Sequence, residues 1–91
     1  MEWYRHYFIE FCKEHSYVSG IKIAKIYREE YMPELHTQRI LLYNVERSLS
    51  IRASRLITEG YKNDYLAKFS KKTYEVDHKK LKKYLKNLEN D

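Results

Sequence analysis

The sequence predicts a small domain of the α+β class, mainly α-helical with one β-hairpin. Apolar residues recur at helical spacing in four separate segments, which predicts four helices. A stretch before the last of these segments combines β-prone residues with polar turn residues, which predicts the hairpin. The chain has 91 residues, two glycines and one proline, so we expect a single domain over residues 1–91 without long flexible linkers.

The first predicted helix covers residues 2–15. Tyr4, Phe8 and Cys12 follow one another at four-residue spacing and form the centre of its apolar stripe. Cys12 is the only cysteine, which excludes an internal disulfide. We therefore expect Cys12 to be buried as a small apolar side chain.

The second predicted helix covers residues 20–31 and follows a short extended or turn segment at residues 16–20. Ser19 is a suitable N-cap. The helix is expected to end at Met32, because a residue before proline avoids the helical region. The residues of its predicted buried stripe are Ile23, Ala24, Tyr27 and Tyr31.

The third predicted helix covers residues 37–50, with Thr37 as its N-cap. Its two faces differ in chemistry. The residues of the expected inner face are Leu41, Val45 and Leu49, helped by Ile40 and Leu42. The residues of the opposite face are Arg39, Tyr43, Arg47 and Ser50. This separation indicates a helix that packs on one side and presents cations on the other.

Residues 55–69 allow two interpretations. The favoured one is a hairpin with strands at 55–58 and 65–69 and a polar loop at 59–64, in which Gly60 and Asn63 can adopt positive φ. The alternative extends the third helix through Ala53 and Leu56 and ends it at Gly60. Residues 73–76 are β-prone and predict a further short strand.

The last predicted helix covers residues 77–89, with Asp77 as its N-cap. The residues of its apolar stripe are Leu81, Tyr84, Leu85 and Leu88, and lysines fill the other face. Such a face also suits a membrane surface, a second nucleic-acid contact or a dimer partner. We expect a solvated helix whose leucines close the core.

The net charge of +5 lies entirely in the second half of the chain. Residues 1–45 contain six Lys or Arg and six Asp or Glu, whereas residues 46–91 contain twelve and seven. This asymmetry suggests a surface that meets phosphate or another acidic partner.

The sequence lacks the patterns that catalysis or metal binding requires. No glycine-rich loop is present, the four histidines are scattered, and Cys12 with His15 makes only one metal-ligand pair. We expect no catalytic residue, cofactor or metal. Charges interrupt the first fifteen residues, and no apolar run approaches about 18 residues, so we expect an intracellular, cytoplasmic protein without a membrane partner.

The order of helix, extended segment, helix, turn, helix, hairpin and helix resembles the winged helix-turn-helix family of DNA-binding domains, from Tyr4 to about Val76. Ile23 and Ala24 stand where that family places an apolar–alanine pair that lets the next helix approach closely. Met32-Pro33 departs from the family's short glycine turn. The basic, Tyr- and Lys-rich composition also resembles the small winged helices encoded by archaeal viruses and plasmids.

The resemblance implies sequence-specific binding of double-stranded DNA by a transcriptional regulator without catalytic activity, associated with the nucleoid. Helix 37–50 would enter the major groove, and the hairpin, with Gly60 and Lys62 at its tip, would follow the backbone or enter the minor groove. A homodimer is expected, because two-fold operators match two-fold proteins. The residues expected to contact base edges are Gln38, Arg39, Tyr43, Asn44 and Arg47. Those expected near phosphates are Ser19, Lys22, Lys25, Arg52, Arg55, Lys62 and Lys68.

Two other functions fit the same sequence. Tyr-rich helices are typical of interfaces, which allows a protein-interaction module such as a small inhibitor or adaptor without nucleic-acid binding. The basic half of the chain also allows a binder of structured RNA.

Overall fold

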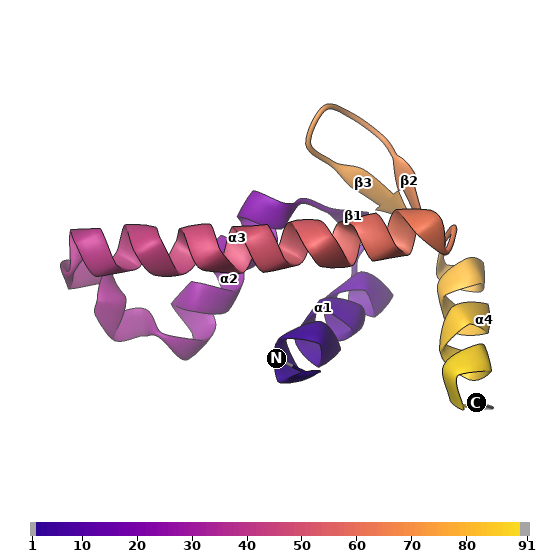
Figure 1. Ribbon diagram of the computed structural model, residues 1–91, viewed down its shortest axis with the longest axis horizontal. Helices are drawn as coiled ribbons and strands as arrows, with labels where there is room; N and C mark the ends of the chain where they lie inside the picture. Colours follow the sequence, from indigo (N-terminus) through magenta and orange to yellow (C-terminus); the bar gives the residue numbers. More distant parts are fainter. Residues whose placement is uncertain (1, 90–91) are drawn as a thin grey trace.

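The computed structural model describes residues 2–89 and is mainly helical, with a small antiparallel sheet, which confirms the α+β class. Figure 1 shows the arrangement. The elements in chain order are α1 (Glu2–Glu14), β1 (Tyr17–Val18), α2 (Gly20–Tyr31), the 3-10 helix η1 (Pro33–Thr37), α3 (Arg39–Lys62), β2 (Leu66–Lys68), β3 (Tyr74–Val76) and α4 (His78–Glu89).

Helix α3 is the axis of the molecule. Its 24 residues make a rod about 36 Å long, close to the 42 Å longest extent of the chain. Helix α1 lies on one side of the rod and the β2–β3 hairpin projects from the other side (Figure 1). Helix α2 starts on the hairpin side and crosses α3, and α4 follows at the C-terminal end of the rod. Helices α1 and α2, the 3-10 helix η1 and strand β2 all contact α3.

The sheet has the strand order β1-β3-β2 with antiparallel pairing throughout. Leu66 pairs with Val76 and Lys68 with Tyr74, while Val18 pairs with Tyr74 from the other side of β3. Val18, Leu66 and Val76 are buried, so one face of the sheet contributes to the core.

The core lies where α1, α2 and the C-terminal part of α3 meet the sheet. Tyr4 spans two of these helices, since its hydroxyl donates to the carbonyl of Leu49 at 3.0 Å. The main buried residues are Tyr4, Phe8, Cys12, Val18, Ile23, Ala24, Tyr27, Leu49, Ala53, Ile57, Tyr65, Leu66, Val76 and Leu81. The predictions that Cys12 and the Ile23–Ala24–Tyr27 stripe are buried are confirmed.

The favoured prediction for residues 55–58 is wrong, because α3 continues through them to Lys62. The buried residues Leu49, Ala53, Ile57 and Gly60 recur every three or four positions, which is a helical period. The β-prone pair Leu56-Ile57 suggested a strand, but both residues lie in the helix, where Ile57 is buried and Leu56 packs partly buried against the core. The alternative of an extended helix is closer to the structure, although the helix ends two residues after Gly60.

Gly60 lies inside α3, so the prediction that it forms a hairpin tip is also wrong. A Cβ at this position would meet Leu66 Cδ1 at 2.6 Å and Tyr65 Cε1 at 2.8 Å. The glycine therefore permits β2 to return closely along the helix, and no positive φ is involved. The reversal occurs after Lys62, where Asp64 adopts a φ of 66° and the Asn63 side-chain amide donates to the carbonyl of Glu59 at 2.8 Å.

The hairpin is shifted along the chain relative to the prediction. Strand β2 falls inside the predicted second strand, and β3 confirms the strand predicted at 73–76. The loop between them is residues 69–73, which replaces the predicted loop at 59–64. We call residues 66–76 the wing hairpin.

Helix boundaries agree with prediction to within two residues except at the end of α3. Asp77 caps α4, since its carboxylate accepts from the Lys80 amide at 3.1 Å. Thr37 belongs to η1 and is not the N-cap of α3, which is Gln38. Ile40 and Leu41 were expected to face inward and are exposed, because the N-terminal part of α3 extends beyond the core. Tyr31, also expected to be buried, is exposed at the C-terminal end of α2.

Candidate nucleic-acid interface

Exposed cations lie along α3, from its first residue to the segment beside the wing hairpin. Arg39, Tyr43 and Arg47 are all exposed, as predicted. Successive residues of an α-helix are about 100° apart, so Arg47, Ser54 and Thr58 project within about 40° of one another. Ser54 and Thr58 lie beside the hairpin, and the row that contains Arg47 therefore points to the hairpin side of the helix.

A groove of about 250 Å³ separates α3 from the wing hairpin. Three elements meet there: the middle of α3, the N-terminus of α2 and the end of the hairpin loop. The lining residues are Ser19, Gly20, Ile21, Ser54, Ile57, Thr58, Lys72 and Tyr74. The first amides of α2 have no partners within their own helix and carry the positive end of its dipole, so this groove is electropositive even apart from its lysine.

The hairpin loop presents two lysines at its tip. The amides of Phe69 and Ser70 both donate to the Thr73 carbonyl, at 3.0 and 3.1 Å, which closes the loop around Lys71 and Lys72. Below the tip the Phe69 ring packs on Tyr17 with centroids 4.6 Å apart. The loop is thus held at its base by aromatic packing while its two cations remain exposed.

Sequence reasoning missed several residues of this surface. Ile51, which was not predicted, is 48% exposed and lies one turn along α3 from each of the predicted residues Arg47 and Arg55. Lys71 and Lys72 were not selected because the hairpin loop was placed one element too early. The polar run Ser-Lys-Lys-Thr at residues 70–73, between two β-prone segments, was the signal that could have located this loop.

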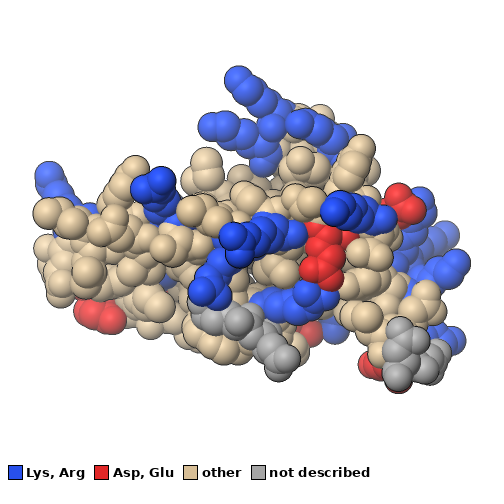
Figure 2. Space-filling view, viewed as in Figure 1, with Lys and Arg blue, Asp and Glu red and all other residues tan. Residues whose placement is uncertain are grey.

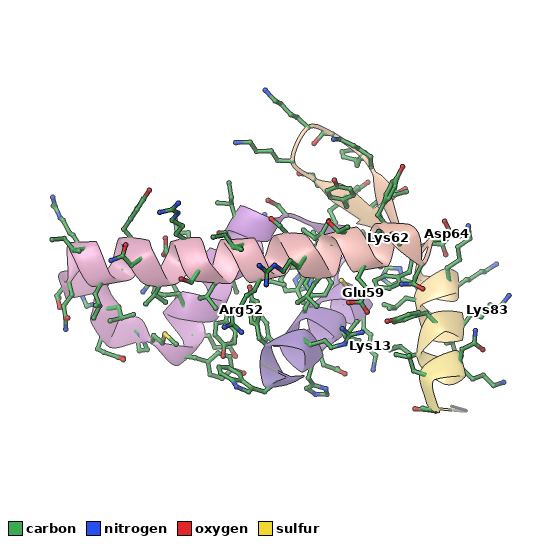
Figure 3. The ribbon with its side chains drawn as sticks, in the orientation of Figure 1. Lys13, Arg52, Glu59, Lys62, Asp64 and Lys83 are labelled. Atoms are coloured by element: carbon green, nitrogen blue, oxygen red, sulfur yellow. The ribbon has the colours of Figure 1, made fainter. Side chains whose placement is uncertain are left out.

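Several predicted residues lie away from the groove. Arg52 is about 140° around α3 from Arg47. It lies on the side of α1, close enough to Tyr4 of that helix for its charge to oppose the rise that burial causes in the pKa of the Tyr4 hydroxyl. Figure 3 shows Arg52 on a different side of α3 from the hairpin. Lys62 lies in the last turn of α3 and not at a hairpin tip, so that prediction is wrong. Gln38 and Asn44 are exposed near the opposite end of α3.

Lys22 and Lys25 are exposed in the first two turns of α2, as the predicted phosphate contacts require. Lys68 lies at the end of β2, with its ammonium 5.9 Å from the centre of the Tyr74 ring. These three lysines are exposed on elements that contribute to the groove, but the cation that lines the groove itself is Lys72.

The two carboxylates of α3 are engaged elsewhere, whereas Glu75 of β3, in the wing hairpin, is exposed. Glu46 accepts from Arg28 at 3.1 Å and Glu59 pairs with Arg5. Among the described side chains, those of residues 3–89, no Arg of α3 and no Lys of the wing hairpin takes part in an ion pair. Figure 2 shows blue side chains on the hairpin loop, along α3 and on α4.

We also searched the described part of the chain for a reactive thiol, a metal site and a membrane-spanning helix. Burial raises the pKa of the Cys12 thiol to about 12, so the residue is not a nucleophile at neutral pH. Where side chains are described, in residues 3–89, no group of three or more His, Cys, Asp or Glu is placed to hold a metal ion. No helix in that range has the length and apolar character needed to cross a membrane.

Comparisons with protein-family models, with curated proteins and with solved structures found no match for this chain. We therefore infer its function from its own geometry and charge.

Proposed function

We propose that this chain is a winged helix-turn-helix protein that binds double-stranded DNA and regulates transcription. The element order α1-β1-α2-α3-β2-β3 and the strand order β1-β3-β2 support this assignment. The observation that carries it is the groove where the exposed row of α3, the N-terminus of α2 and the lysine-bearing hairpin loop converge. These are the parts needed to read bases and to hold the phosphates on both sides.

The middle of α3 enters the major groove in this proposal. A helix of about 10–12 Å diameter fits a groove about 12 Å wide, but a rod of about 36 Å cannot lie in it along its whole length. The segment beside the hairpin, residues 47–58, is the part that phosphate contacts can hold on both flanks. Arg47 offers a planar fork for guanine, and Ile51, about 40° away around the helix, offers an apolar contact for the methyl group of thymine. Arg55 projects about 80° from Arg47, between Arg47 and Arg52.

Phosphate contacts come from two directions. Lys71 and Lys72 hold the backbone on the hairpin side, with Lys68 behind them. The free amides at the start of α2, together with Lys22 and Lys25, hold the backbone on the other side. Arg39 and Tyr43, farther along α3, contact DNA beyond the central segment if the duplex follows the rod.

Fluorescence anisotropy with a labelled duplex of mixed sequence tests this function. We expect binding that weakens steeply between about 50 and 200 mM salt, and a random-duplex selection that returns a defined sequence. Absence of binding to any duplex at low salt contradicts the proposal. Tighter binding to a structured RNA than to every selected duplex assigns the surface to RNA instead.

We also propose that the protein pairs as a homodimer on a two-fold operator. Trp3 is 54% exposed and Tyr31 is 55% exposed, and both rings pack on the buried Tyr27, at 5.3 and 4.8 Å between centroids. Such exposed aromatic surface is typical of an interface. Sedimentation equilibrium should give a dimer that Trp3→Ala with Tyr31→Ala converts to a monomer, and a monomer at all concentrations, alone and on DNA, contradicts this part.

A further inference from the structure

We propose that the seam between α1 and α4 is a docking groove for an acidic amphipathic helix of a protein partner. Two adjoining hollows of about 700 and about 410 Å³ lie along this seam and share Lys13, Leu85 and Glu89 as lining residues. The groove uses α1 and α4, whereas the groove of the proposed function uses α2, α3 and the wing hairpin. The two surfaces can therefore be occupied and tested independently.

The groove is preformed because α4 is fixed at several points. Glu59 of α3 accepts from Arg5 of α1 and, at 2.8 Å, from the Tyr84 hydroxyl of α4. Leu81 is buried in the core, and His78 Nε2 lies 3.1 and 3.0 Å from the carbonyl oxygens of Cys12 and His15. Helices α1 and α4 therefore already have the positions that a partner requires, which lowers the entropic cost of binding.

The floor of the groove is apolar and open. Ile9 of α1 and Leu85 of α4 line it, and Leu88 remains 47% exposed at its end. A pocket for a small molecule covers about 70–90% of its ligand, whereas an open seam between two helices covers only one side. A helix that inserts residues at i, i+3, i+4 and i+7 matches such a seam, because its other side stays in water.

The charge around the groove selects the partner. Lys82 and Lys86 line its α4 side one turn apart, while Lys13 opposite them is already paired with Glu10 at 3.0 Å. Helix α4 as a whole carries five lysines against one glutamate. A second copy docking on α4 brings lysines against lysines, which is unfavourable. A helix with glutamates beside its leucines meets complementary charge on the α4 side.

Figure 3 identifies a matched control on the same helix. Lys13 extends from α1 toward α4, whereas Lys83 points away from α1 on the outer side of α4. Lys79 precedes Lys83 by one turn and therefore shares its face. The pair Lys79 and Lys83 has the same charge and spacing as Lys82 and Lys86 but does not line either hollow.

The probe is a fluorescein-labelled synthetic helix of about 15 residues, with leucines on one stripe and glutamates elsewhere, and its lysine counterpart. We expect the full chain to bind the glutamate peptide, and the Lys82→Glu/Lys86→Glu variant to lose it at least about tenfold and to gain the lysine peptide. Lys79→Glu/Lys83→Glu should change affinity by less than about threefold. Leu88→Asp, at an exposed position, should abolish binding without unfolding the chain.

Four outcomes overturn the inference. Equal effects of the two double variants show general attraction between charges. Absence of peptide binding together with Leu88-dependent binding to vesicles containing phosphatidylserine assigns the seam to a membrane surface. Self-association that Leu88→Asp abolishes assigns it to a second copy. Displacement of the peptide by duplex DNA shows that the groove is part of a nucleic-acid surface. A chain that binds no DNA but binds the glutamate peptide in the expected way contradicts only the proposed function.

Discussion

The two halves of α3 differ in what they contact, although they form one continuous helix. Residues 49–62 contribute Leu49, Ala53, Ile57 and Gly60 to the interior, where α1, α2 and the sheet surround them. In residues 39–48 no side chain is fully buried, and Ile40 is 80% and Tyr43 66% exposed. The C-terminal half of α3 therefore determines stability, and its N-terminal half is free to meet a partner.

This difference explains how a small chain presents a long surface. The buried half anchors the rod, so the other half needs only α2 and η1 beside it, tied by the Arg28–Glu46 ion pair. The proposed DNA-contacting segment, residues 47–58, spans the boundary: its inner side is in the core and its outer side is exposed. A substitution there affects folding or binding according to the side of the helix on which it falls.

The same substitution at two isoleucines of α3 tests the comparison most strongly. Ile57→Ala should lower the free energy of unfolding by about 2–5 kcal/mol, because Ile57 is buried between α3 and α2. Ile40→Ala should change it by less than about 0.5 kcal/mol, because the side chain is already in water. Urea denaturation followed by circular dichroism measures both. Equal losses would mean that the N-terminal half of α3 is packed after all.

The two glycines provide a second matched pair. Gly60→Ala should destabilise by about 1–3 kcal/mol, because its Cβ would meet Leu66 at 2.6 Å. Gly20→Ala should be neutral or stabilising by up to about 1 kcal/mol, since the nearest atoms would lie at 3.6 Å in ordinary contact. Thermal unfolding measures the two melting temperatures, and a Gly60→Ala protein as stable as the parent would disprove the close approach of β2.

Two arginines of α3 distinguish its sides in DNA binding. Arg47→Ala should weaken binding to a selected duplex by about 1–3 kcal/mol and relax the preference at one position, because Arg47 lies on the hairpin side. Arg52→Ala should have a much smaller effect, because Arg52 points toward α1. Anisotropy titrations at one salt concentration measure both affinities. A larger loss of affinity with Arg52→Ala than with Arg47→Ala would mean that DNA binds on the α1 side of α3 and would contradict the proposal.

The smallest effect concerns the polar cluster that holds α4. Hydrogen bonds from Arg5, and then from Tyr84, lower the pKa of Glu59 despite its partial burial. A carboxyl whose folded pKa is depressed stabilises the fold above its unfolded pKa of about 4.3, and that stability is lost as pH falls through the folded value. Glu59→Gln should therefore lower stability by about 1 kcal/mol at pH 7, given that the cluster is partly exposed.

The difference between parent and Glu59→Gln should shrink as pH falls below about 4. Melting temperatures across that range measure it. A difference that stays constant with pH would show that the Arg5–Glu59–Tyr84 cluster contributes no charge-dependent stability.

The sequence was sufficient for the helices and insufficient for the connection between α3 and the sheet. Three- and four-residue spacing located α1, α2 and α4 because each buries one stripe along its length. Residues 55–58 are ambiguous locally, and they continue α3 because Leu49, Ala53, Ile57 and Gly60 are buried along one side of a single helix. The misplaced hairpin then moved the predicted tip from Lys71 and Lys72 to Lys62.

The candidate surface was predicted in part for the same reason. The exposure of Arg39, Tyr43 and Arg47 was predicted from periodicity, but Ile40 and Leu41 of the expected inner face are exposed too. The roles of Ser54, Thr58 and Lys72 depend on the packing of α2 and the hairpin against α3, which no local pattern encodes. Only the outcome of folding shows that Arg52, close to Arg47 in sequence, projects to another side.

The salt dependence of duplex affinity tests the central claim most directly. For a protein whose hairpin tip holds the DNA backbone, Lys71→Ala/Lys72→Ala should reduce the slope of log affinity against log salt by about 2. The matched variant Lys79→Ala/Lys83→Ala, on the outer side of α4, should leave that slope unchanged. A slope that falls with the α4 pair and not with the hairpin pair would contradict the claim that DNA binds along the hairpin side of α3.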